Sequence, residues 1–292
     1  MQNKFQAYKQ LARNISIVEN ELLGYEFLLE NLNHQHTPIV GITGAPGAGK
    51  STITNALVRE YVKQNKRVAI LAIDPSSPFN FGSLLGDRVR MAEHFNSENV
   101  FIRSLASRGS LGGLCEKILE VCDVIKAADF DLIIVETVGV GQSEVEIAGL
   151  ADITIVALTP AAGDEVQNMK AGLMEIADVF VVNKSDMPNA EGFIKNLERL
   201  IHERFIRKWQ IPVVKTIATE NVGIVNLQQV IEQYFTEKHN PEKKLQLITD
   251  KAFRLIQQRR MKGFDKATFK VELEQNYQQP AFNLYQLIKK YV

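Results

Sequence analysis

The amino-acid sequence predicts an α/β fold with a mostly parallel sheet and helices on both of its faces. Seven short apolar runs, rich in Val and Ile, recur along the chain with helical patterns between them. The runs are nearly continuous rather than alternating, which is typical of strands covered on both faces. They occupy Pro38–Thr43, Val68–Ile73, Val100–Arg103, Leu132–Val135, Ile153–Leu158, Val179–Val182 and Ile211–Val214.

Two flanking segments lack such runs and carry apolar residues at helical spacing instead. These residues are Leu11, Ile15, Val18 and Leu22 near the N-terminus, and Leu245, Ile248, Phe253 and Ile256 near the C-terminus. We therefore predict an N-terminal helical extension over residues 1–37, a central α/β domain over 38–238 and a C-terminal helical extension over 239–292.

Composition narrows the class of protein. The chain has 292 residues, a formal net charge of +0 and 45% hydrophobic residues, so it can form a sizeable core. The balanced charge argues against general nucleic-acid binding. Cys115 and Cys122 form no C-x-x-C pair, which favours buried, reduced thiols. The polar N-terminus has no signal-peptide core and no run could span a bilayer, so we expect a cytoplasmic protein that does not enter membranes.

A glycine-rich motif follows the first apolar run. The pattern G-x-x-x-x-G-K-[ST] begins at Gly44 and is followed by a helical pattern over residues 53–62. Glycines allow a tight loop whose amides converge on phosphate, and the next helix presents its positive N-terminus to the same anion. Lys50 supplies a cation and Ser51 a hydroxyl for Mg²⁺. The strand, loop and helix together predict a P-loop NTPase, whose candidate contacts are Gly44, Ala45, Pro46, Gly47, Ala48, Gly49, Lys50, Ser51 and Thr52.

A second motif is expected to recognise the base of the nucleotide. Asn183, Lys184 and Asp186 form N-K-x-D directly after an apolar run, as in proteins that bind guanine. A carboxylate can accept hydrogen bonds from the ring N–H and the exocyclic amine of guanine, whereas adenine would leave Asp186 unpaired. Ala218 is a third candidate contact, through its amide, although Ile217 stands where Ser is usual. The motif predicts GTP and GDP as ligands.

Acidic residues at strand ends are candidates for Mg²⁺ and for catalysis. Asp74 ends one apolar run and Asp87 follows it, while Glu136 ends another run. Carboxyl ends of parallel strands gather at one edge of a sheet, where a metal site would lie. Asp74 could instead begin a D-P-S-S turn, and Asp87 could be a solvated loop residue.

The segment after Glu136 carries two further candidates. Gly139 can offer its amide to the γ-phosphate, and hydrolysis would then release the loop. Gln142 could orient the attacking water or could equally be an exposed loop residue. Spacing alone identifies no general base or arginine finger, and the candidate cations are Arg88, Arg90, Arg103 and Arg108.

Taken together, several motifs resemble the methylmalonyl-CoA mutase-associated GTPases. These motifs are GAPGAGKST, DPSSPF, SRGSLGGL, VETVGVGQSE, AGDEVQ and NKSD, in that order over approximately residues 38–225. The family includes relatives of the human methylmalonic aciduria type A protein and members labelled arginine/ornithine transport ATPases. The resemblance implies GTP and Mg²⁺ binding, slow hydrolysis, a homodimer and association with an adenosylcobalamin-dependent acyl-CoA mutase, whose cofactor loading and protection depend on nucleotide state.

The same resemblance bears on two other parts of the chain. Asp164, Gln167 and Lys170 would share one face if helical, and the family uses this region as a mobile loop that relays the state of the partner. The resemblance also makes the C-terminal extension a candidate dimerisation element.

Two other functions remain open. One is a transport-linked nucleotidase or kinase, which N-K-S-D and the lack of an L-S-G-G-Q motif disfavour. The other is a metallochaperone of the nickel-inserting group. Such proteins usually carry His-rich or Cys-rich tracts, and His34 with His36 is a poor substitute.

Overall fold

A computed structural model describes most of the chain: residues 2–33, 36–74, 91–106, 115, 117–137, 147–162, 171–204, 209–237, 241–261, 263–277 and 282–291. The chain forms two compact units, Met1–Lys244 and Leu245–Val292.

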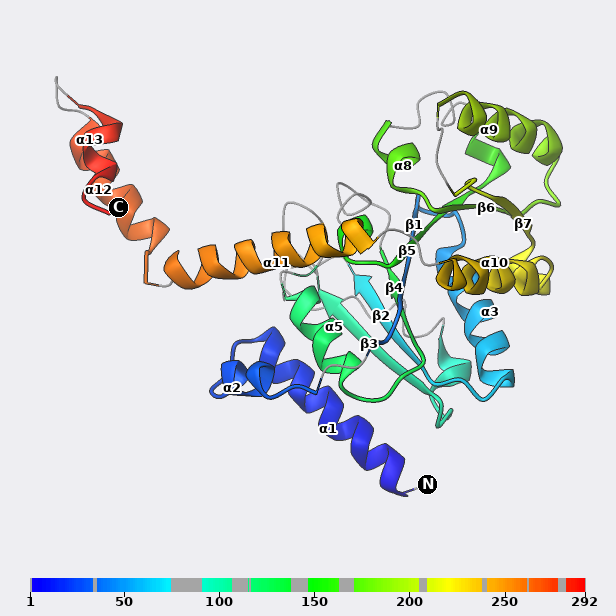
Figure 1. Cartoon of the computed structure of the whole chain (residues 1–292), viewed down its shortest axis with the longest axis horizontal. Coiled ribbons are helices and arrows are strands. Elements are labelled where there is room, and N and C mark those ends of the chain that lie inside the picture. Colours follow the sequence, from blue (N-terminus) through cyan, green and yellow to red (C-terminus); the bar gives the residue numbers. More distant parts are fainter. Residues whose placement is uncertain are drawn as a thin grey trace. The chain divides into compact units, whose positions relative to one another are not determined.

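Within the first unit, the described residues form one sheet of seven strands (Figure 1). The strand order is β3-β2-β4-β1-β5-β6-β7, and the paired strands run parallel. The strands are β1 (Ile39–Gly44), β2 (Val68–Asp74), β3 (Val100–Ala106), β4 (Leu132–Glu136), β5 (Ile153–Leu158), β6 (Val179–Asn183) and β7 (Val213–Thr216). The predicted parallel α/β fold is confirmed.

Several strands continue past their apolar runs at the carboxyl end. β1 ends at Gly44, β4 at Glu136 and β6 at Asn183, each one residue beyond the end of its predicted run. The backbone hydrogen bonds of the sheet continue there, as in the pairing of Ile42 with Glu136. The last residues of β4 and β6 have polar side chains because this edge of the sheet borders the candidate site and is not covered by a helix.

Helices cover both faces of the sheet, as Figure 1 shows. One face packs on α3 (Lys50–Lys63) and α10 (Ile224–Thr236). The other packs on α1 (Gln2–Glu19), α5 (Ile118–Lys126) and α9 (Ala190–Arg204), with the short α2 (Tyr25–Glu30) and α8 (Ala171–Ile176). Short 3₁₀ turns link these elements: η1 (Ala92–His94), η2 (Ile147–Gly149), η3 (Pro160–Ala162) and η4 (Ala218–Glu220).

The N-terminal segment packs on the core of its own unit. Leu11, Ile15 and Val18 of α1 are buried in the cluster that includes α5, as their helical spacing predicted. The hydroxyl of Tyr8 donates to the carbonyl oxygen of Glu98 at 2.8 Å. Both cysteines are buried, one of them within α5, and the described residues contain no disulfide.

The second unit is helical, as predicted for the C-terminal segment. Its helices are α12 (Lys266–Tyr277), α13 (Leu284–Ile288) and all but the first turn of α11 (Pro241–Met261). Phe264, Phe269 and Tyr291 pack ring against ring, with centroids 5.2–5.3 Å apart. In the described part of the chain, no helix has the length and apolar character needed to cross a membrane.

Candidate nucleotide site

The glycine-rich loop joins β1 to α3 and needs glycine at both of its ends. Gly44 has φ 139° and Gly49 has φ 85°. A Cβ atom on Gly44 would lie 2.1 Å from the carbonyl oxygen of Ala157, and one on Gly49 would lie 2.2 Å from Nδ2 of Asn183. The neighbouring strands therefore leave no room for a side chain, and the loop backbone approaches them closely.

Lys50 is the first residue of α3 and is 7% exposed. Its Nζ donates hydrogen bonds to the carbonyl oxygens of Gly44 and Ala45, at 2.8 Å and 3.0 Å. The side chain therefore folds back along the loop and places a positive charge beside the helix N-terminus. A cation beside the N-terminal amides of a helix is an arrangement that binds phosphate.

Ser51 and Glu136 meet at the same edge of the sheet. The Ser51 hydroxyl donates to Oε1 of Glu136 at 2.5 Å, and both side chains are buried. Beside them, the Thr137 hydroxyl donates to that of Thr43 at 3.0 Å, which ties the ends of β4 and β1 together. The structure therefore brings together two of the four predicted metal ligands. A hydroxyl and a carboxylate oxygen are ligands suited to Mg²⁺.

Asn183 connects the loop to the residues predicted to contact the base. Its Nδ2 donates to the carbonyl oxygen of Ala48 at 3.0 Å. Its Oδ1 accepts hydrogen bonds from the Thr216 hydroxyl and the Ala218 amide, each at 3.1 Å. Our sequence reasoning assigned Asn183 to the base and missed these partners. The change from apolar to polar residues toward the end of β7 was the sequence signal that could have identified Thr216.

The remaining base-reading candidates lie on turns around Asn183. Lys184 has φ 55°, and the Ser185 amide donates to the carbonyl oxygen of Thr216 at 3.1 Å. This turn leaves the side chains of Lys184 and Asp186 exposed, as a base-binding carboxylate must be before ligand arrives. The Ala218 amide is engaged by Asn183, so a guanine carbonyl would have to share or replace that bond.

Several predicted site residues fall outside the described part of the chain. They are Asp87, Gly139, Gln142, Asp164, Gln167 and Lys170. Asp74 ends β2, and only its backbone is described. The roles of these residues stay predictions.

The parallel sheet, the glycine loop at the start of α3 and the N-K-S-D turn beside it define a P-loop GTPase, an enzyme that binds GTP and hydrolyses it to GDP and phosphate. Residues 11–268 match the family model described as methylmalonyl Co-A mutase-associated GTPase MeaB. The chain belongs to the MeaB family.

Relatives agree with this assignment. A Pyrococcus abyssi protein named as a GTPase is 46% identical over 229 residues, which are 76% of this chain and 71% of the relative. The methylmalonic aciduria type A homolog of Mus musculus, named as mitochondrial, is 36% identical over 216 residues, or 70% and 51% of the two chains. A crystal structure titled LAO/AO transport system kinase has a TM-score of 0.67 and 26% identity, covering 99% of this chain and 98% of that one.

Proposed function

We propose that this GTPase is a chaperone and gatekeeper for an adenosylcobalamin-dependent acyl-CoA mutase of the methylmalonyl-CoA type. GTP hydrolysis would be coupled to loading of the mutase cofactor and to protection of the mutase. The observation that carries the proposal is the extent of the family match, which runs from α1 through the GTPase core into α12. The match therefore includes α1, α11 and the start of α12, which carry none of the predicted nucleotide contacts.

Hydrolysis consumes one water molecule. The water oxygen attacks the γ-phosphorus, the bond from that phosphorus to the β–γ bridging oxygen breaks, and GDP and phosphate leave. In our proposal Lys50 and the loop amides stabilise the negative charge on the phosphates as this bond breaks. The contacts of Lys50 with Gly44 and Ala45 support this role, because they hold its charge beside the loop before ligand binds.

Mg²⁺ would be held by Ser51 and Glu136, with Asp74 and Asp87 as further candidate ligands. The support is the burial of both side chains and the hydrogen bond between them, which joins Ser51, the residue after Lys50 in α3, to Glu136 at the end of β4. Bound Mg²⁺ neutralises charge on the outer phosphate oxygens. Glu136 positions the Ser51 oxygen by accepting its hydrogen bond, and both oxygens fit a hard cation.

Two other segments would supply the remaining contacts of the mechanism. Gly139 would contact the γ-phosphate, Gln142 would orient the attacking water, and the segment with Asp164, Gln167 and Lys170 would relay the state of the mutase. Glu136 ends β4 directly before the first of these segments, which supports coupling between the nucleotide and that segment.

We further propose a homodimer that uses the C-terminal extension. On α11, Phe253 and Ile256 are 61% and 52% exposed within the described chain, and their spacing of three places them on one helix face. Large apolar side chains on one face of a long helix favour contact with another protein surface, and a second copy of the chain supplies one.

The test is GTP hydrolysis by the purified protein, with and without a purified adenosylcobalamin-dependent acyl-CoA mutase from the same source. We expect slow GTP turnover that the mutase stimulates, no comparable ATP turnover, and loss of turnover when EDTA removes Mg²⁺. ATP preference, or an unchanged rate with every such mutase, would contradict the proposal.

The structure titled LAO/AO transport system kinase makes a second outcome worth measuring. A kinase that acts on a transport binding protein would transfer the γ-phosphoryl group to that protein, whereas a GTPase transfers it to water. With γ-³²P-labelled GTP, we expect the label to appear as free phosphate. Stable labelling of a transport binding protein would favour the kinase instead.

A further inference from the structure

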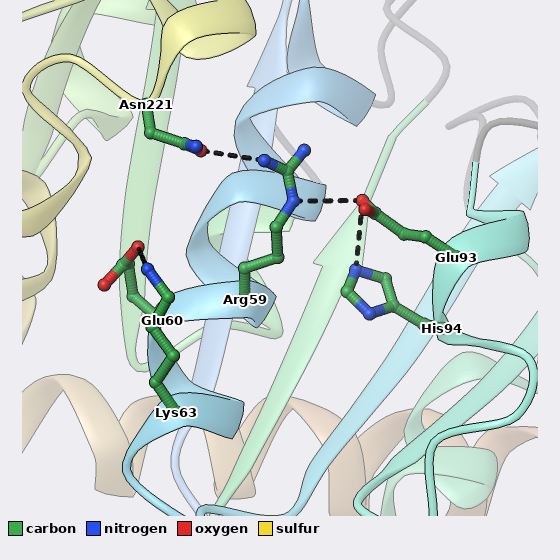
Figure 2. Close-up of polar contacts among 6 residues, drawn as sticks. All are labelled: Arg59, Glu60, Lys63, Glu93, His94 and Asn221. Atoms are coloured by element: carbon green, nitrogen blue, oxygen red, sulfur yellow. Dashed lines mark hydrogen bonds and ion pairs between the residues drawn. The ribbon is translucent and has the colours of Figure 1, made fainter.

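Arg59 connects two segments that lie far from it in sequence. It projects from α3, and its Nε donates to Oε1 of Glu93 in η1 at 3.1 Å. Its Nη1 donates to Oδ1 of Asn221, the residue directly after η4, at 2.9 Å. Figure 2 shows the guanidinium between these two partners. One side chain of the phosphate-binding helix therefore holds the turn that contains Ala218.

The turn that Arg59 holds is narrow. Asn221 has φ 58°, in the left-handed region, and its amide lies 3.4 Å from the Ala218 carbonyl oxygen. Ile217 and Val222 close the turn through two backbone hydrogen bonds, of 3.1 Å and 3.2 Å. A shift of Asn221 would therefore move the Ala218 amide, which is only three residues away.

The guanidinium suits this task better than an ammonium group. Its donors lie in one rigid plane, so Nε and Nη1 can hold Glu93 and Asn221 in a fixed relative position. A lysine could keep the positive charge but not this geometry. The Arg59 side chain is 33% exposed and that of Glu93 is 44% exposed, so solvent screens the ion pair and its contribution to overall stability is small.

Glu93 is itself held against α3. The next residue, His94, is buried, and its Nε2 lies 3.5 Å from Oε1 of Glu93. Burial lowers the pKa of His94, which the nearby Glu93 and a hydrogen bond with the Asn55 backbone partly oppose. The ring is therefore neutral at pH 7, and the positive charge facing Glu93 is that of Arg59. His94 from within and Arg59 from the surface together fix η1 on α3.

We propose that Arg59 is a positioning residue for base recognition: by holding Asn221, it keeps the Ala218 amide, which donates to Oδ1 of Asn183, where the 6-carbonyl oxygen of guanine can share that donor. The proposal rests on the proposed role of Ala218 in reading the base. Glu93 orients the guanidinium, so the affinity for guanine depends on a contact between α3, η1 and the turn after β7.

The test compares Arg59→Met with Lys63→Met. Lys63 lies one turn further along α3, and its Nζ contacts only Glu60 of the same helix among the contacts drawn in Figure 2, at 2.6 Å. We would measure binding of GDP and of the diphosphate of 2-aminopurine riboside, which lacks the 6-carbonyl oxygen and, with it, the proton on N1. Each variant is compared with the wild type for the same nucleotide, so the loss of the N1 proton affects both proteins alike. Arg59→Met should weaken GDP binding by about three- to fivefold and leave binding of the analogue unchanged.

The controls separate base positioning from a structural effect. Lys63→Met should bind both nucleotides as the wild type does, and Arg59→Lys should keep the GDP defect despite its charge. Urea unfolding midpoints of all variants should match that of the wild type. Equal weakening for both nucleotides, no weakening of GDP binding, or the same loss in Lys63→Met would overturn the proposal.

A second variant tests the contact itself. Asn221→Gly removes the acceptor while tolerating the positive φ. It should weaken GDP binding as Arg59→Met does, and the double variant should be no weaker than either single one, because both remove one interaction. Additive losses would overturn the proposal.

Failure of this proposal can be told apart from failure of the proposed function. Wild-type protein that binds GDP and the analogue equally well would remove the base-reading role of Ala218 and this proposal with it. Stimulation of GTP hydrolysis by the mutase is a separate measurement that such a result would leave intact.

Discussion

The side-chain amide of Asn183 donates to the carbonyl oxygen of Ala48 across a distance of 3.0 Å. This bond joins the end of β6 to the phosphate loop. Because Oδ1 of the same side chain holds Ala218, one buried residue connects the region expected to read the base with the region expected to bind phosphate. This side chain therefore fixes the relative position of the two regions.

Asn183→Ala should disturb both regions. The change removes the partner of the Ala48 carbonyl, the Thr216 hydroxyl and the Ala218 amide, and buried polar groups left without partners cost about 1–3 kcal/mol each. We expect a lower free energy of unfolding in urea and weaker GDP binding. Asn14→Ala, which loses one exposed hydrogen bond with Gln10 in α1, should change neither by a comparable amount.

The two loop glycines should not tolerate alanine. Gly44→Ala and Gly49→Ala should each lower thermal stability and GDP affinity, because the new Cβ atom would overlap Ala157 or Asn183. Gly192 is an exposed glycine of α9 with no atom within 4 Å of an added Cβ, so it supplies the control. Gly192→Ala should raise stability, by up to about 1 kcal/mol. Wild-type GDP affinity in Gly44→Ala would contradict the geometry of the loop.

Lys50→Ala should abolish GTP turnover. The variant lacks the cation that lies beside the loop, and we expect hydrolysis to fall by about 100-fold or more. The measurement is phosphate release at saturating GTP, with Lys63→Met as the matched change on the same helix. An unaltered rate in Lys50→Ala would show that the site lies elsewhere.

Asp186→Asn should change base preference without unfolding the protein. Asp186 is exposed, so its replacement leaves no buried group unpaired. The asparagine offers an amide donor and a carbonyl acceptor, which complement xanthine better than guanine. We expect lower GTP affinity and higher affinity for xanthosine triphosphate in competition binding. Full GTP affinity in this variant would refute the assignment of Asp186 to the base.

Stability should depend on pH through His94. Burial lowers the pKa of His94 in the folded protein, whereas the unfolded chain has the usual value of about 6.5. Below that value the unfolded state binds the proton more readily, so the free energy of unfolding should fall as the pH drops through about 6.5 toward the folded pKa. His94→Gln should flatten this part of the urea-unfolding profile. A wild-type profile as flat as that of the variant would show that His94 is not the group responsible.

The sequence alone determined the elements and the local motifs. Each of the seven apolar runs overlaps a strand, and only Pro38, Ile211 and Pro212 of these runs lie outside one. A strand covered on both faces needs continuous apolar residues wherever it stands in the sheet. The loop from Gly44 to Lys50 was also predictable, because its shape depends on residues that are adjacent in the chain. The sequence pattern ended β1, β4 and β6 one residue too early. At the candidate site the residues stop being apolar before the backbone pairing of the sheet stops.

Only the tertiary structure decided which of these residues meet. Ser51 and Glu136 are 85 positions apart, Ala48 and Asn183 are 135 apart, and Arg59 and Asn221 are 162 apart. Each contact depends on the order of strands in the sheet, which places β4 and β5 on either side of β1 and β6 next to β5. That order results from packing helices on both faces at once, and the pattern of any single segment contains no information about its neighbours.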